Sequence, residues 1–159
     1  MRFRRRFSVE NQRGFTLMEL MIVIAVISVI TMISLPIYTN MLARARVGKA
    51  QADLRGLVST IAAFGAHCGD IPATVAWTNA APLAAAGGNA TCSAAVGGNL
   101  GTLSQIVTDA ASIPAGPFYT QLPVPPVGWQ YTYTRTGVTT FTLSGTNPQD
   151  LPNPGIVLP

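Results

Sequence analysis

The chain has 159 residues and a formal net charge of +4 at pH 7. Its length is that of one modest domain once a short leader is set aside. Residues 1–14 hold five arginines against one glutamate, whereas the rest of the chain holds five basic and five acidic side chains. This distribution argues against nucleic acid as a main partner, because phosphate binding needs positive charge in the body of the protein.

A long apolar segment follows the basic start. From Phe15 to Tyr38 the only charged side chain is Glu19. A helix of that length rises roughly 36 Å, enough to cross a hydrocarbon core of about 30 Å. We therefore predict a membrane-spanning helix over residues 15–38. An excess of arginine beside a span stays cytoplasmic, so the part of the chain after the span is expected on the far side.

Glu19 is the first candidate functional residue. A carboxylate inside a membrane span costs on the order of 3 kcal/mol, so it indicates a function and a cationic partner. A secretory signal peptide would explain the basic start, but the apolar run is too long, no small-residue cleavage site follows it, and Glu19 lies inside it. A plain signal anchor explains the length but leaves the carboxylate unexplained.

The stretch Gly14-Phe15-Thr16-Leu17-Met18-Glu19 resembles the signal of type IV prepilins and type II secretion pseudopilins. Residues 36–38 and 43–47 are similar to the helix of type IVa pilins. The resemblance implies that prepilin peptidase cuts between Gly14 and Phe15 and N-methylates Phe15. Glu19 is then the fifth mature residue and takes part in assembly.

The resemblance also implies where the protein works and with what. The subunit would be stored in the bacterial inner membrane, in contact with lipid, and would then polymerise with copies of itself through its N-terminal helix. Expected partners are an assembly platform protein with its ATPase, and minor pilins or pseudopilins. The filament would be either an extracellular pilus or a periplasmic pseudopilus, and the sequence leaves both open.

Pro36 interrupts the hydrogen bonding of the predicted helix. It removes one backbone donor, which predicts a kink or a local loss of helix near residues 33–35. In the pilin family a proline at this place is associated with a stretch that melts when subunits pack. The resemblance therefore assigns Pro36 a role in assembly.

The helix is expected to continue as an amphipathic helix over residues 39–68. Its apolar positions at helical spacing are Leu54, Leu57, Val58, Ile61 and Phe64. Lys49 and Asp53 form an i,i+4 pair, and Gly69 followed by Pro72 predicts the end of the helix. The basic residues between 44 and 55 are assigned to a solvated face or to pairing between helices, in preference to uptake of DNA.

Residues 69–121 are predicted to form a long connecting region. Residues 73–101 show little periodicity and read as a surface loop, which corresponds in place to the variable αβ-loop of pilins. Cys68 and Cys92 are the only cysteines and are expected to form a disulfide in an oxidising compartment. A metal site or a nucleophile involving the adjacent His67 is the weaker alternative, because a fourth ligand and a conventional spacing are missing.

Two further elements are predicted before the end of the chain. A capping box at residues 102–105 predicts a short helix over about 103–111. In residues 122–159 a proline-rich connector precedes two alternating segments joined by a turn at Thr136-Gly137, which predicts a β-hairpin followed by a proline-rich tail. The fold class is therefore α+β, a long N-terminal helix packed on a small antiparallel sheet.

The sequence predicts a structural protein that is not an enzyme and binds no cofactor. The chain has one histidine and no arrangement of serine, histidine and aspartate, no paired carboxylates and no phosphate-binding loop. The Leu122-Pro123-x-x-Pro126-x-Gly128 connector is similar to the major pseudopilin, which carries calcium after its last strand. In this chain Asp150 is the only carboxylate in that stretch, whereas calcium needs about six to eight oxygen ligands, so no metal is expected. A minor binding subunit that uses the loop around Trp77 is a further alternative.

Overall fold

The structure is a computed structural model that describes residues 14–151 and 155–159. The predicted leader, apart from Gly14, therefore lies outside the described residues. The chain divides by its internal contacts into two units, the first ending at Met41 and the second running from Leu42 to Pro159. One helix, α1 (Leu17–Cys68), supplies residues to both units.

In the second unit, α1 buries one stripe of side chains. Its buried residues are Ala50, Leu54, Leu57, Ile61, Phe64 and Gly65. The helix ends at Cys68, and Gly69 follows with a φ of +74°, a left-handed conformation that favours glycine. The N–H of Gly69 donates to the carbonyl of Gly65 at 2.8 Å. The amphipathic helix and its predicted end are both confirmed.

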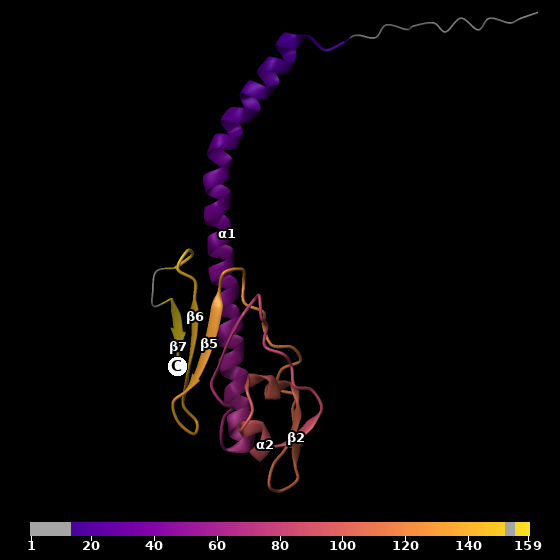
Figure 1. Cartoon of the computed structure of the whole chain (residues 1–159), viewed down its shortest axis with the longest axis vertical. Coiled ribbons are helices and arrows are strands. Elements are labelled where there is room, and N and C mark those ends of the chain that lie inside the picture. Colours follow the sequence, from indigo (N-terminus) through magenta and orange to yellow (C-terminus); the bar gives the residue numbers. More distant parts are fainter. Residues whose placement is uncertain (1–13, 152–154) are drawn as a thin grey trace, which may run out of the picture. The chain divides into compact units, whose positions relative to one another are not determined.

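The main sheet has four antiparallel strands in the order β1-β5-β6-β7. The strands are β1 (Val75–Thr78), β5 (Gln130–Arg135), β6 (Phe141–Thr146) and β7 (Ile156–Leu158). The predicted hairpin is β5 and β6, paired so that Tyr131 lies opposite Gly145 and Tyr133 opposite Leu143. In Figure 1 the last three strands run beside the second part of α1.

The core of the second unit joins α1 to one face of this sheet and includes buried residues of the connecting region between β1 and β5. A Cβ on Gly145 would come within 3.0 Å of Leu54 Cδ1, so a larger residue there would require the Leu54 side chain to shift. The buried Tyr131 hydroxyl donates to Asp53 on α1 at 2.9 Å, and that of Tyr133 donates to the Pro72 carbonyl at 2.9 Å. The predicted α+β fold, helix packed on antiparallel sheet, is confirmed.

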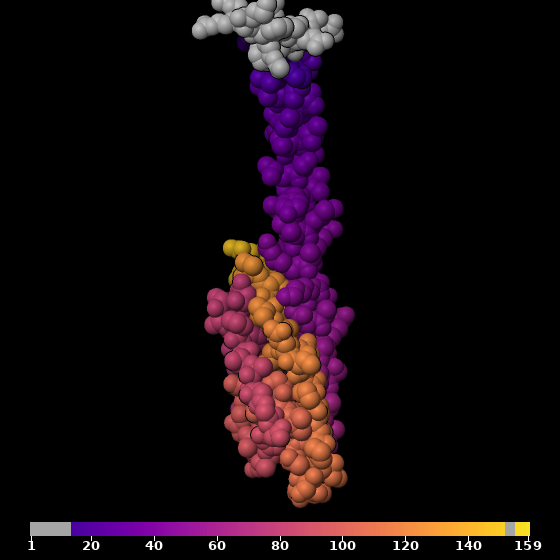
Figure 2. Space-filling model, turned by 90° about the vertical axis from the view of Figure 1, so that its right-hand side faces the viewer, coloured from indigo at the N-terminus to yellow at the C-terminus, as the bar shows by residue number. Residues whose placement is uncertain are grey.

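A second, three-stranded sheet lies in the connecting region. Its strands are β2 (Asn89–Thr91), β3 (Ile106–Thr108) and β4 (Pro114–Ala115), in that order. Between β2 and β3 lie the short helix α2 (Cys92–Val96) and the 3₁₀ turn η1 (Leu100–Ser104). In the space-filling view, pink and orange segments, which follow α1 in the sequence, lie against one side of its second part (Figure 2).

The helix predicted over 103–111 is wrong. The chain instead forms η1, capped by Asn99, whose side chain accepts from the N–H of Gly101, and then strand β3. Ile106, Val107 and Thr108 are β-branched and all pair with β2, and Val107 and Thr108 also pair with β4. Pairing with distant segments therefore overrides the local capping pattern.

Three smaller expectations also need correction. The 73–101 region is not a single loop, because it contains β1, β2 and α2, and the C-terminal tail contains β7. Of the kink or local loss of helix expected near residues 33–35, the loss is absent, because α1 is helical through Pro36, and the kink stays a prediction. A single missing donor leaves the flanking helical hydrogen bonds in place, and they hold the turn together.

Candidate functional site

The candidate site begins where α1 starts. The hydroxyl oxygen of Thr16 accepts a hydrogen bond from the backbone N–H of Glu19 at 3.2 Å, and the Thr16 carbonyl accepts from Leu20 at 3.3 Å. Thr16 is therefore the N-cap of α1, and Glu19 is the third residue of the helix. Thr16 is not among the residues predicted from the sequence. Its signal was the Thr-x-x-Glu pattern before an apolar run.

Glu19 lies in the first turn of α1. A carboxylate there interacts favourably with the positive end of the helix dipole. Among the residues that the structure describes, Glu19 has no ion-pair partner, and the residues around it are exposed. The structure thus places Glu19 in the first turn of the helix without an ion-pair partner among the described residues.

The first part of α1 is an apolar surface without a partner in its own unit. The apolar side chains from Phe15, which is 86% exposed, to Met41 are all solvent-accessible. Within the described residues, α1 is the one helix long and apolar enough to cross a membrane, and none of its apolar window is buried. An apolar surface of this extent marks an interaction with lipid or protein.

The serine and threonine hydroxyls on this surface between Ser28 and Thr39 donate to acceptors within the helix. Ser28 donates to the Ala25 carbonyl at 2.8 Å, and Ser34 donates to the Ile30 carbonyl at 2.9 Å. Thr31 and Thr39 likewise donate to carbonyls three or four residues earlier. Because each of these four hydroxyls has an acceptor within its own helix, none of the four needs another partner in an apolar environment.

Pro36 changes the hydrogen bonding on the same surface. It has no N–H, so the carbonyl of Met32, four residues earlier, loses its helical donor. Met32 is strongly exposed. Pro36 is therefore the weakest point of hydrogen bonding in the first part of α1, and its predicted role in assembly stays a prediction.

The predicted cysteine pair lies at the far end of α1. Cys68 and Cys92 form a disulfide across 24 positions, which ties the end of α1 to the start of α2. Ligand atoms of these two residues and His67 lie within 4.8 Å of one another. The sulfur atoms are bonded to each other, so neither is a thiolate able to bind a metal. In the described chain, buried His67 Nε2 has no hydrogen-bond partner, which nothing here explains.

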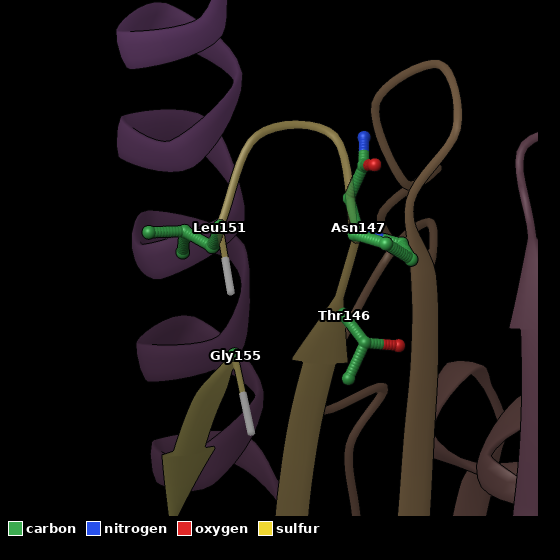
Figure 3. A pocket seen from close by; sticks show the side chains of 5 residues that line it. Thr146, Asn147, Leu151 and Gly155 are labelled. Atoms are coloured by element: carbon green, nitrogen blue, oxygen red, sulfur yellow. The ribbon is translucent and has the colours of Figure 1, made fainter. Parts of the chain in front are cut away.

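Asp150 closes the turn after β6. Its carboxylate, almost fully buried, accepts from Arg46 Nη1 at 3.2 Å, from Trp129 Nε1 at 2.8 Å and from Asn147 Nδ2 at 2.9 Å. Both carboxylate oxygens are thus bonded to protein donors, and the carboxylate neutralises Arg46. Figure 3 shows the pocket beside this turn, whose labelled lining residues are Thr146, Asn147, Leu151 and Gly155.

Comparison with known proteins gives a family for the N-terminal segment and several relatives. The family described as "Prokaryotic N-terminal methylation motif" matches residues 10–35. The type IV major fimbrial protein FimA of Dichelobacter nodosus is 39% identical over 80 residues, 48% of this chain and 50% of that protein. A fimbrial protein of Moraxella nonliquefaciens is 50% identical over 50 residues, 31% of this chain and 32% of the relative.

The likeness extends to a further pilin but covers only part of each protein. The type IV major pilin protein PilE1 of Neisseria gonorrhoeae is 39% identical over 61 residues, 38% of this chain and 37% of that pilin. The chain thus spans half or less of the length of these curated relatives. No solved structure matches it significantly.

Proposed function

We propose that the chain, a member of the type IV pilin superfamily by its methylation motif and its fimbrial relatives, is a structural subunit of a type IV pilus filament. The observation that carries this proposal is the first part of α1. It combines an exposed apolar surface with a single carboxylate at its start. Such a surface needs a cover, first lipid and then the same helix of other copies.

Processing of the N-terminus prepares the subunit in this proposal. The arginine-rich leader stays on the cytoplasmic side of the inner membrane, and the second unit is exported. Prepilin peptidase cuts between Gly14 and Phe15 and methylates the new terminus. The α-amino group of Phe15 then lies four residues from Glu19 and supplies the cation that this carboxylate lacks in the described chain.

The register of assembly follows from this charge pair. The amine of an entering subunit meets Glu19 of a neighbour, and opposite charges attract strongly where water is excluded. Hydrophobic contacts alone do not fix the register, because lipid competes equally for leucine and isoleucine. The platform protein and its ATPase drive the extraction of the subunit from the membrane, and minor pilins join the same filament.

A secretion pseudopilus is the second candidate. Its support is the connector between Leu122 and Gly128, which is similar to that of the major pseudopilin. The leucine and two of the prolines of this connector are buried. Against it stand the relatives, which are named as fimbrial proteins and pilins, and the Asp150 carboxylate, which is bound to protein donors where the major pseudopilin holds calcium. The pilus is therefore the better supported filament.

The test is to find the chain in filaments and to count it. Filaments sheared from cells that carry the gene should contain the chain in large excess over every other component. Mass spectrometry should find it starting at methylated Phe15. An antibody to the second unit should label filaments along their length outside the cell. Labelling at the tip alone would indicate a minor subunit, and retention in the periplasm would indicate a pseudopilus.

A further inference from the structure

The charged side chains of the second unit are mostly paired within the chain. The ion pairs are Arg46–Asp150, Lys49–Asp53 and Arg135–Asp70. Residues 42–159 contain five arginine or lysine side chains and four aspartates. Within the described part of this unit, two cations, Arg44 and Arg55, and one carboxylate, Asp109, belong to none of these ion pairs. These three charges lie on two separate surfaces.

The two cations lie on one exposed side of α1. Arg44 and Arg55 are 11 residues apart, so at 100° per residue they come within about 20° of the same direction. Gly48 and Ala52 lie between them and are exposed, and a Cβ placed on Gly48 would meet no atom within 4 Å. We call Arg44, Gly48, Ala52 and Arg55 the cationic face.

The carboxylate belongs to a braced loop between β3 and β4. Asp109 Oδ1 accepts from the N–H groups of Ala111 at 2.9 Å and Ile113 at 2.8 Å, while the Asp109 N–H donates to the Ile113 carbonyl at 3.1 Å. Within the described residues, Oδ2 accepts no hydrogen bond. Ile113 is 57% exposed. We call residues 109–113 the acidic loop, a rigid projection with one available oxygen and one apolar side chain.

The acidic loop and the cationic face of one chain cannot meet. Asp109 lines the same groove as His67 and Cys68, at the C-terminal end of α1. Arg55 precedes Cys68 by 13 residues and Arg44 precedes it by 24, or about 20 Å and about 36 Å along the helix. These separations exceed the reach of a side chain. A contact between the two surfaces must therefore join two copies that are displaced along the helix axis.

We propose that the acidic loop of one copy docks on the cationic face of another copy, further along the filament than the neighbour whose Phe15 amine meets Glu19, as a second subunit contact in the proposed filament. Asp109 pairs with Arg44 or Arg55, and Ile113 packs on the open helix surface at Gly48 and Ala52. Because the two surfaces differ, the contact is head-to-tail, and repeated contacts of this kind build an open helical assembly instead of a closed dimer. The contact rests on the proposed function but involves none of the residues in the first part of α1.

Cysteine cross-linking in the full chain tests the contact directly. Ile113→Cys is combined with Ala52→Cys or with Gly48→Cys, and whole filaments are oxidised mildly and separated without reductant. We expect a ladder of linked subunits from at least one double variant and monomers from each single variant. The matched control combines Ala52→Cys with Val138→Cys, whose side chain is exposed to the same degree as Ile113 but lies in the β5–β6 turn.

Charge exchange tests the same contact without new bonds. Asp109→Asn keeps the oxygen that braces the loop and removes the charge, so it should lower the yield of sheared filaments about threefold while the folded subunit stays abundant. Asp109→Arg should lower the yield further. Pairing it with Arg44→Glu or Arg55→Glu should recover most of the wild-type yield in one of the two combinations.

The outcomes separate this contact from the proposed function. If wild-type cells make no filaments of this chain, both proposals fail together. If filaments form but neither double cysteine variant gives a ladder, or the control gives an equal ladder, the docking contact is rejected and the pilus function stands. Filament yields equal to the wild type in both Asp109→Asn and Asp109→Arg would likewise reject the docking contact.

Discussion

The two parts of α1 are the same secondary structure with opposite surroundings. From residue 17 to 41 the helix is exposed on every side, and its only charge is Glu19. From residue 42 to 68 it buries a stripe centred on Leu54, Leu57 and Ile61 and carries five further charges on its other sides. Apart from the donor missing at Pro36, the backbone is helical throughout both parts, so the main difference lies in what covers the side chains.

The comparison separates stability from assembly. The second part of α1 finds its apolar partner in the sheet of the same chain, so substitutions there act on the free energy of unfolding. The first part has no partner in its own unit, so substitutions there act on insertion and on contacts with other copies. A residue's position on one side or the other of residue 41 should therefore decide which measurement responds.

The largest effect is expected at the junction before the helix. Gly14→Val should block cleavage completely, because the proposed peptidase needs a residue without a side chain at this position. The whole membrane pool should then keep residues 1–14, as intact-mass measurement would detect, and filaments should be absent. The second unit should fold as in the wild type. A normally processed Gly14→Val chain would contradict the cleavage site.

Glu19→Ala should come next in size. The subunit should insert and be cleaved, but filaments should fall more than tenfold, because the Phe15 amine loses its partner in the neighbouring copy. Counting filaments by electron microscopy, with the cleaved membrane subunit measured on the same cells, checks this. Met18→Ala is the matched control one residue earlier. Filaments of normal number and length in Glu19→Ala would remove Glu19 from the mechanism.

Cys92→Ser should act only on the folded unit. Loss of the disulfide frees a loop of about two dozen residues and should lower the free energy of unfolding by about 3 to 4 kcal/mol. Denaturant unfolding of the purified subunit, with and without reductant, measures this. Reductant should weaken the wild type to the level of the variant and leave the variant unchanged. Quantitative alkylation of both thiols in the native wild type would refute the pairing.

The same substitution in the two parts of α1 sharpens the comparison most directly. Ile61 is fully buried and Ile27 is 52% exposed. Ile61→Ala should lower the free energy of unfolding of the second unit by about 3 kcal/mol, through lost burial and a cavity. Ile27→Ala should change it by less than about 0.5 kcal/mol. Equal losses would mean that the first part of α1 also contributes to the folded core.

Alkaline pH should give the smallest effect. Burial raises the pKa of Tyr133 to about 12, from an unfolded value near 10. The neutral tyrosine is favoured in the folded state, so its contribution is present in full below pH 10 and is lost as the pH rises to 12. The loss should be about 2 kcal/mol, read from unfolding curves across this window. Tyr133→Phe should make the profile less steep, and the remaining slope comes from Tyr131 and Tyr119, whose pKa values burial also raises.

Local patterns predicted the elements whose signals lie within a few residues. The end of α1 follows from Gly69, and the hairpin follows from alternating aromatic residues on β5 and the turn after Arg135. The start of α1 was equally readable from Thr16 and Glu19, although only the carboxylate was singled out. In these cases the physical cause is a cap, a turn or a periodic apolar face, and each is written in the adjacent sequence.

Elements that depend on distant partners were not readable in the same way. β1 is a strand because Val75 and Trp77 lie opposite Tyr133 and Tyr131, more than 50 residues later. The capping pattern at 102–105 does not produce the expected helix, because β3 pairs with β2 and β4 instead. The carboxylate of Asp150 is held by Arg46, more than 100 residues earlier. No local window contains such information.

The sequence by itself determined that α1 begins near Thr16, that its first part is apolar with one carboxylate, and that its second part is amphipathic. Those properties come from side-chain chemistry at fixed helical spacing. Only the tertiary structure decided which charges remain unpaired, because pairing depends on which distant segments meet. In the described chain, Arg44, Arg55 and Asp109 are therefore available to a second copy, while the other charged side chains of the second unit form ion pairs within the same chain.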